Sequence, residues 1–180
     1  NHQCSSDGRA PLMVAAENGK TAMVEWLLKQ GVSLNEKNIN GLTAFHYAAR
    51  YGHLEAVRLL TAKIKEAGLN IDEEDNNGDT ALSLAAWQGH EKIVNYLHEE
   101  GANLNHQCSS DGRTPLMLAA KNGKTAMVEW LSKQGASLNE KNKEGLTALH
   151  LAALNLSKIS SAISLVFSLI CSAFMFSCSA

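Results

Sequence analysis

The segment Gly112–Asn139 reads GRTPLMLAAKNGKTAMVEWLSKQGASLN, and its pattern decides the fold. Thr114 followed by Pro115 is typical of a helix start, because threonine caps free backbone N–H groups and proline fits the first turn. Gly123 interrupts this helix after about two turns. A second run, with apolar residues at helical spacing, ends before Gly135, where a left-handed residue can close the helix. The segment therefore predicts a helix, a tight turn, a second helix and a loop.

The same unit recurs along most of the chain, at spacings of 33, 37, 34 and 33 residues. Each copy begins at an equivalent glycine: Gly8, Gly41, Gly78, Gly112 and Gly145. One short helix pair cannot bury its apolar face alone, so neighbouring units must stack. The second unit has four extra residues near Thr61–Glu66. These amount to about one helical turn, which would lengthen its second helix without rotating the buried face.

A longer duplication lies over these units. Residues Asn1–Ala49 match Asn105–Ala153 at an offset of 104 positions, and forty of the first fifty residues are identical. Such identity indicates a recent duplication of a long block, and it places nearly the same local sequence at both ends of the predicted stack.

The period and the pattern together resemble the ankyrin repeat, over about residues 1–153. The units would be 7–39, 40–76, 77–110 and 111–143, with a partial unit at 144–153 and the tail of a preceding unit at 1–6. The resemblance implies an all-α ankyrin-repeat solenoid with finger loops, in which His46 and His150 keep the motif histidine that bonds within the scaffold. The first unit has Ala10 in place of the capping threonine, which should cost ~0.5–2 kcal/mol.

Composition narrows the function classes. The 180 residues carry sixteen Lys and Arg against eighteen Asp and Glu, a net charge of −2, with no basic stripe. Duplex nucleic acid is therefore not expected as a partner. Hydrophobic residues make up 45% of the chain, which is enough for a folded core. Four cysteines are too few for a disulfide scaffold.

No set of residues predicts catalysis, a cofactor or a metal. The Gly-Lys-Thr triplet at 19–21 lacks the glycine five positions earlier that a phosphate-binding loop needs, because Val14 stands there. The acidic run 72–78 would need a closing acid at position 84, which is Leu84. The histidines have no nucleophile or carboxylate at a recurring spacing. We expect a protein that is not an enzyme.

The resemblance also implies where a partner would bind, since ankyrin repeats contact partners through loop tips and the exposed end of each first helix. The candidate partner-binding residues are Arg9, Glu17, Asn18, Arg50, Tyr51, Asp79, Trp87, Gln88, Arg113, Lys121 and Asn122. Arg50, Tyr51 and Trp87 stand out because such side chains dominate interface hot spots. The plainer alternative is that Trp87 packs on Tyr51 as ordinary surface.

A second aromatic set lies on the second helices. Trp26, Tyr96 and Trp130 occupy one equivalent position, which we interpret as part of the core.

The repeat pattern stops at Leu154, and the predicted array 1–153 is followed by a hydrophobic, non-repeat tail at 154–180. Residues 159–180 carry no charge and could form a helix about 33 Å long, enough to span a membrane. Three interpretations stay open: a translated intron or gene-model error, a membrane anchor, and an apolar cap on the last repeat.

The sequence thus predicts a non-catalytic protein-interaction module, an adaptor or scaffold that binds a protein partner in its concave groove. Ankyrin folds host many binding roles, so the partner itself is not predicted. The alternatives are a membrane-associated ankyrin protein, either a tail-anchored scaffold or the cytosolic part of a channel, and a regulatory fragment of a larger enzyme. We expect an intracellular, cytoplasmic location, with membrane anchorage through 159–180 as the alternative.

Overall fold

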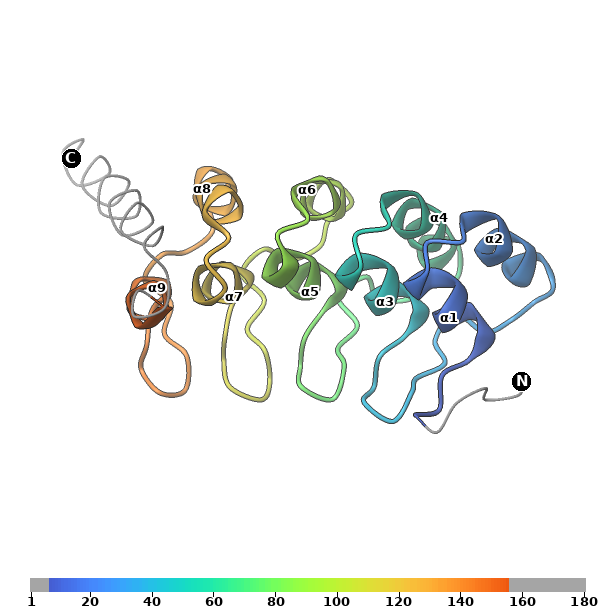
Figure 1. Cartoon of the computed structure of the whole chain (residues 1–180), viewed down its shortest axis with the longest axis horizontal. Coiled ribbons are helices and arrows are strands. Elements are labelled where there is room, and N and C mark those ends of the chain that lie inside the picture. The colour runs from blue at the N-terminus through green and yellow to red at the C-terminus, as the bar shows by residue number, and fades with distance from the viewer. Residues whose placement is uncertain (1–6, 156–180) are drawn as a thin grey trace.

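The computed structural model describes residues 7–155, which contain nine helices and no strand. The helices form two layers, with the odd-numbered helices in one row and the even-numbered helices in the other (Figure 1). Their bounds are α1 Pro11–Glu17, α2 Thr21–Lys29, α3 Ala44–Arg50, α4 Leu54–Glu66, α5 Ala81–Gln88, α6 Glu91–Glu99, α7 Pro115–Lys121, α8 Thr125–Lys133 and α9 Ala148–Asn155. The all-helical solenoid predicted from the sequence is confirmed.

The helix starts follow the predicted chemistry. The Thr114 hydroxyl accepts a hydrogen bond from the Met117 N–H at 3.3 Å, which caps α7. At the equivalent start of α1, Ala10 provides no side-chain cap. In α3 the Thr43 backbone N–H and hydroxyl both lie within hydrogen-bonding distance of His46 Nδ1, so the histidine closes a capping box.

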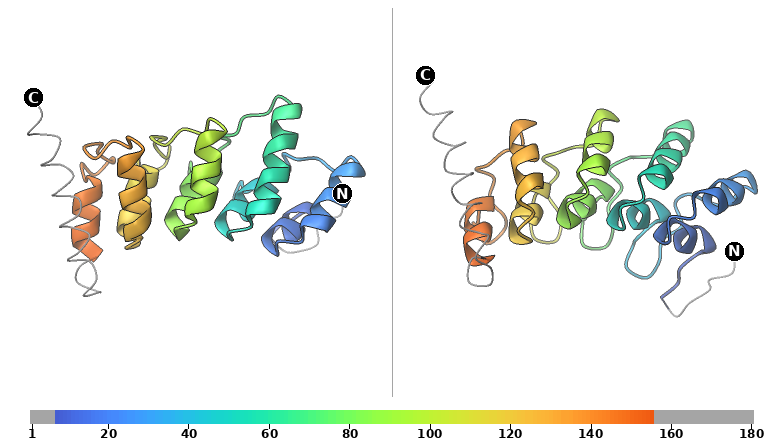
Figure 2. Two further views of the ribbon diagram at one scale, coloured as in Figure 1. Left: turned by 90° about the horizontal axis from the view of Figure 1, so that it is seen from above. Right: turned by 45° about the horizontal axis from the view of Figure 1, so that its top comes forward.

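Alanine pairs let the inner helices pack closely. Each of α1, α3, α5, α7 and α9 contacts the next in the row. Every one of these helices carries fully buried alanines: Ala16, Ala48, Ala49, Ala85, Ala86, Ala119, Ala120 and Ala152. The outer helices cover this row, and seen from above the pairs lie side by side along the molecule (Figure 2). The buried apolar side chains form one continuous core along the stack.

The outer helix of the second unit is longer, as the extra residues predict. α4 has 13 residues, whereas α2, α6 and α8 have nine each. Leu60 and Ile64, one helical turn apart, are both buried. The added turn therefore extends the buried stripe along the same face.

The finger loops are joined to one another by backbone hydrogen bonds. One N–H in each finger donates to a carbonyl of the preceding finger: Ile39 to Asp7, Asn76 to Asn40, Ser110 to Asn77 and Lys143 to Asp111. Asn38, Asp75 and Asn142 shape three of the turns, because each side-chain oxygen accepts two backbone N–H groups of its own loop. The acidic run 72–78 therefore contains a turn residue, Asp75, whose carboxylate is used within the loop.

The first and last units of the duplicated block differ in burial despite their common sequence. Trp26 is 56% exposed and Met23 is 51% exposed, whereas the equivalent Met127 is 1% exposed and Trp130 packs partly buried against the core. A preceding helix pair, α5 and α6, covers the second copy. The prediction that the tryptophans and Tyr96 form core is therefore wrong for Trp26, because no described unit stacks on that face.

The last described helix, α9, runs to Asn155, beyond the predicted end of the array at 153. Of the predicted tail 154–180, residues 156–180 lie outside the described part of the chain, so its three interpretations stay predictions. Within residues 7–155, no helix is both long and apolar enough to cross a membrane.

Candidate functional site

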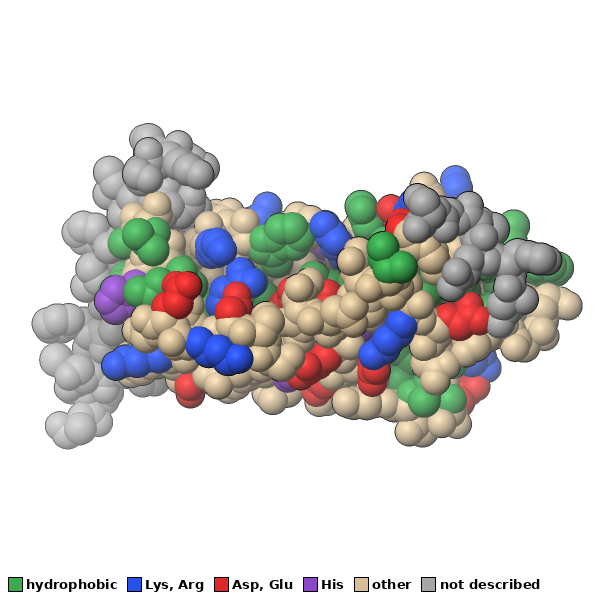
Figure 3. Space-filling model, turned by 90° about the horizontal axis from the view of Figure 1, so that it is seen from below, with side chains coloured by type: hydrophobic (Ala, Val, Ile, Leu, Met, Phe, Trp, Pro, Cys, Tyr) green, Lys and Arg blue, Asp and Glu red, His purple; other side chains and the backbone are tan. Residues whose placement is uncertain are grey.

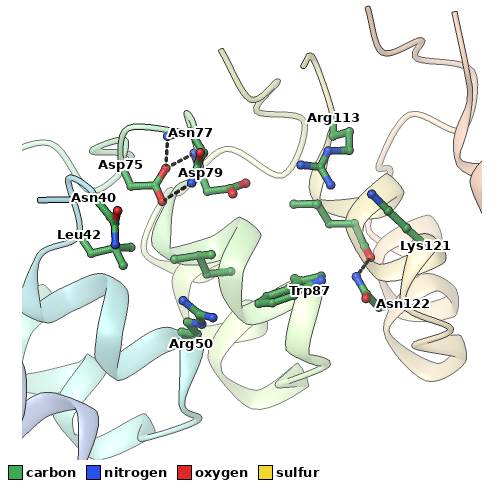
Figure 4. A pocket seen from close by; sticks show the side chains of 12 residues that line it. Asn40, Leu42, Arg50, Asp75, Asn77, Asp79, Trp87, Arg113, Lys121 and Asn122 are labelled. Atoms are coloured by element: carbon green, nitrogen blue, oxygen red, sulfur yellow. Dashed lines mark hydrogen bonds between the residues drawn. The ribbon is translucent and has the colours of Figure 1, made fainter. Parts of the chain in front are cut away.

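A hollow of about 520 Å³ lies in the middle of the stack, between the fingers and the ends of the inner helices. Its walls come from three successive units (Figure 4). The lining residues are Asn40, Leu42, Arg50, Asp75, Asn77, Asp79, Leu84, Trp87, Arg113, Leu118, Lys121 and Asn122. Six of the eleven predicted site residues are among them: Arg50, Asp79, Trp87, Arg113, Lys121 and Asn122. The face of the molecule seen in Figure 3 carries charged side chains of both signs among apolar patches.

Trp87 and Arg50 form the centre of this hollow. The Arg50 guanidinium carbon lies 5.3 Å from the centre of the Trp87 ring and 5.9 Å from that of Tyr51, within the range of cation–π attraction. Tyr51 in turn stacks on Tyr47 with ring centres 6.3 Å apart. Trp87 is half-buried, and Arg50 lies against both its ring and that of Tyr51; within residues 7–155 no direct ring contact joins Trp87 to Tyr51. The arginine thus holds two aromatic rings in place on the groove surface.

Two aspartates line the wall beneath the fingers. The Asp75 carboxylate accepts the backbone N–H groups of Asn77 and Asp79 at 2.8 and 2.9 Å. The Asp79 carboxylate accepts the Ser83 hydroxyl at 3.2 Å. Burial, followed by the nearby charge of Asp75, raises the pKa of Asp79 above its ordinary value. The wall therefore positions one carboxyl that is less readily ionised than a surface aspartate.

The charged residues of the first and fourth units are arranged differently. In the first unit, Arg9 donates to Glu17 at 2.6 Å and forms an ion pair with Asp7 at 2.7 Å. In the fourth unit, Arg113 forms the corresponding ion pair with Asp111, but Lys121 stands where the first unit has Glu17. Sequence comparison alone could have found this charge reversal between duplicated copies.

The other predicted site residues lie outside the hollow. Arg9 and Glu17 are paired with each other in the first unit. Asn18 donates to the Val14 carbonyl at the end of α1. Tyr51 is 45% exposed directly after α3, and Gln88 is the last residue of α5.

Two histidines fix the ends of inner helices, which sequence reasoning missed. His53 Nε2 donates to the carbonyl of Glu17 at 2.7 Å, and His90 Nε2 donates to that of Arg50 at 3.0 Å. Both carbonyls belong to the last residue of an inner helix, in the preceding unit. Gly19 makes room for the first ring, because a Cβ there would lie 2.5 Å from His53 Nδ1. The signal was the Gly-His pair that opens the outer helices of units two and three.

His46 has a structural contact as well. Its Nε2 lies 3.0 Å from the Glu73 carbonyl, which can only accept, so this nitrogen carries the proton and Nδ1 accepts from Thr43. Burial lowers the pKa of His46. In the described chain no three His, Cys, Asp or Glu residues are grouped as metal ligands would be.

Comparison with known proteins identifies the array. A family model described as ankyrin repeats in three copies matches residues 12–108, and a second, described as ankyrin repeats in many copies, matches residues 97–152. The chain belongs to the ankyrin repeat family. Ankyrin repeats are in general protein-interaction modules and are typically non-catalytic, which agrees with the groove described above.

Individual relatives match short stretches of this chain, 51 to 60 residues long. The eye-specific diacylglycerol kinase of Drosophila melanogaster is 39% identical over 51 residues, 28% of this chain and 4% of that protein. A probable E3 ubiquitin-protein ligase of Oryza sativa subsp. japonica, XBOS32, is 43% identical over 51 residues, 28% of this chain and 10% of the ligase. Ankyrin repeat domain-containing protein 63 of Mus musculus is 43% identical over 60 residues, 31% of this chain and 15% of that protein. The matched segments are thus small parts of these relatives.

Proposed function

We propose that this ankyrin array is an adaptor or scaffold module that binds a segment of a protein partner in the hollow around Trp87. The observation that carries the proposal is the Arg50–Trp87 contact at 5.3 Å on the wall of the hollow. Tryptophan and arginine are the side chains most often found at interface hot spots. A half-buried indole held by a guanidinium offers a rigid apolar platform at little cost in side-chain entropy.

The surrounding geometry supports this proposal. Finger-to-finger hydrogen bonds and the His90 bond to the Arg50 carbonyl hold the lining elements before any partner arrives. A surface that is already ordered loses less entropy on binding than a mobile loop does. The function needs no catalytic group, since shape and a few anchors supply the affinity.

Substitution of Trp87 tests the proposal. A library of random twelve-residue peptides displayed on phage would be selected against the whole chain, and the selected peptides measured against Trp87→Ala. We expect affinity to fall about tenfold or more, because a hot-spot truncation costs at least about 1–2 kcal/mol. Trp26→Ala is the matched control, since it removes an equally large ring from the outer helix of the first unit, away from the hollow.

The outcomes are distinct. Selected peptides that bind the Trp87→Ala variant as tightly as the original chain would refute the groove as the binding site. Loss of binding with Trp26→Ala alone would place the site on the outer helices. A large drop in melting temperature for Trp87→Ala would instead assign the ring a structural role.

A second candidate function is the ankyrin segment of a larger enzyme. Two of the relatives above are named as a diacylglycerol kinase and an E3 ubiquitin-protein ligase, and this chain covers 4% and 10% of them. Sequencing the transcript on both sides of the region and across the codons for 153–157 tests this. A catalytic domain in the same reading frame would support this second function. The same sequencing would show whether residues 154–180 are encoded in the message or are a gene-model error.

The place of the chain in the cell is also a proposal. We propose that the chain works in the cytoplasm, with attachment to a membrane through 159–180 as the alternative. Detergent fractionation of cells that express the tagged chain separates the two: recovery in the aqueous fraction supports the first and recovery in the detergent phase supports the second.

A further inference from the structure

We infer that the partner presents a carboxylate to Arg113 and Lys121, three residues along an extended segment from an apolar side chain that lies on Trp87. This inference rests on the proposed function and adds the chemistry of the partner. Its source is the comparison of the two duplicated copies, which share forty of fifty residues but carry opposite charges at one groove position, Glu17 in the first copy and Lys121 in the second.

The first copy shows what an occupied site looks like. Arg9 contacts two carboxylates, Asp7 and Glu17, at 2.7 and 2.6 Å. The side chains of Arg9 and Glu17 are both more than two-thirds buried. The net charge of this trio is −1, so the chain's own glutamate already fills the place beside the arginine.

The second copy lacks this internal ligand. Asp111 and Arg113 repeat the first pair, whereas Lys121 takes the position of Glu17, which changes the net charge of the trio from −1 to +1. Within residues 7–155 no carboxylate forms an ion pair with Lys121, and Asp111 is the one carboxylate that pairs with Arg113. Arg113 and Lys121 both line the hollow, and two positive charges close together repel each other unless an anion lies between them. The place that Glu17 fills in the first copy is therefore available, in the second copy, to a carboxylate supplied from outside.

Neighbouring charges do not fill this place. The Asp75 carboxylate is taken up by two backbone N–H groups of its loop. Asp79 also lines the hollow. Burial is the largest influence on the pKa of Asp79 and raises it, whereas the charge of Arg113 lowers this pKa by a smaller amount. Asn122 uses its amide to donate to the Leu118 carbonyl at 2.8 Å (Figure 4).

Equivalent residues of successive units form a row along the groove, here called the groove row. The spacing of this row sets the spacing of the contacting residues in the partner. Arg50, Trp87 and Lys121 each stand nine residues after the first glycine of consecutive units, so they occupy equivalent places. Packed helices lie about 8–10 Å apart, and an extended chain advances about 3.3 Å per residue. One unit therefore corresponds to about three residues of an extended partner. The fitting segment therefore has an acid three residues from an apolar side chain, and a probe with an acid on both sides of the apolar residue presents this pattern in either chain direction.

The first test compares two synthetic heptapeptides, acetyl-Glu-Ser-Ser-Leu-Ser-Ser-Glu-amide and the same peptide with both Glu replaced by Gln. Binding would be followed by NMR through the Trp87 indole N–H of the whole chain. We expect the Glu peptide to bind at least about tenfold more tightly, and its affinity to fall with added salt, because the contacting charges are near the surface. Equal binding of the two peptides would overturn the inference.

The duplicated copies supply the matched variants. Lys121→Glu recreates the first-unit arrangement, gives Arg113 a second carboxylate of its own chain beside Asp111, and should abolish the preference for the Glu peptide. Glu17→Lys changes the same position in the first unit and should leave binding at Trp87 unchanged. An undiminished preference in Lys121→Glu would overturn the inference, as would a phosphoserine peptide that binds more than tenfold more tightly than the Glu peptide.

The phage selection separates this inference from the proposed function. Trp87-dependent peptides enriched in Asp or Glu three residues from an apolar residue support both. Trp87-dependent peptides without that enrichment leave the proposed function standing and overturn this inference. If no selected peptide depends on Trp87, both are overturned.

Discussion

Met127 and Met23 occupy the same position in two almost identical helices, α8 and α2, but only Met127 is covered by a preceding unit. The exposed fraction of Met127 is 1% and that of Met23 is 51%. The substitutions Met127→Ala and Met23→Ala therefore change the same side chain in the same local sequence. Because helix propensity and the unfolded chain are nearly equal in the two cases, the difference in stability reports the packing against the neighbouring unit.

The size of that difference follows from burial. Met127→Ala removes a fully buried side chain and leaves a cavity, which should lower the free energy of unfolding by about 2–4 kcal/mol. At Met23 about half the side chain is already in water and no enclosed cavity can form, so the loss should be at most about 1 kcal/mol. For an array of this size the first change lowers the melting temperature by roughly 4–16 °C and the second by at most roughly 4 °C.

Calorimetry and urea titration of both variants and of the original chain would measure these losses. The reasoning would be refuted if Met23→Ala destabilised the chain as much as Met127→Ala does. Such equality would show that the face formed by α1 and α2 is covered in solution.

Three further changes test single interactions. Thr114→Ala should lower the free energy of unfolding by about 1 kcal/mol in a urea titration, and Ala10→Thr should raise it by a similar amount, because the first loses the helix cap and the second gains it. Burial raises the pKa of Asp79, so its stabilising contribution is present in acid and lost as pH rises through that raised pKa. Asp79→Asn should accordingly raise the melting temperature near neutral pH and leave it little changed in acid; the reverse order would contradict this. Burial lowers the pKa of His46, so its contribution is present above the ordinary histidine pKa and lost as pH falls through the lowered value. His46→Gln should flatten the fall in melting temperature on mild acidification, whereas His150→Gln, at an exposed motif position, should not.

The repeat period was sufficient to predict the fold, because each unit carries its own helix starts and stops. The same local pattern could not predict burial at the ends of the array. Trp26 and Trp130 have nearly identical neighbours in sequence, and their different exposure depends on whether another unit lies beside them. Periodicity describes a helix face, but the environment of that face is set by residues more than 20 positions away.

The candidate site was predicted only in part, because the repeat pattern gives equivalent positions but not the side-chain contacts made there. The groove row at Arg50, Trp87 and Lys121 follows from equivalent positions in the repeat, and these residues do line one hollow. The repeat pattern alone does not show which charges in the array are already neutralised, because that depends on side-chain contacts such as the one between Arg9 and Glu17. The partner-binding role of the eleven residues stays a prediction.

The histidine bonds between units have a consequence for mapping a minimal binding fragment. His90 belongs to the third unit, yet it fixes the carbonyl of Arg50, a residue of the second. A deletion series that shortens the array from its C-terminal side would therefore loosen Arg50 before removing it. The epitope would then seem to extend one unit further toward the C-terminus than it does. Domain-mapping experiments on this chain should use point substitutions, because its units are not independent parts.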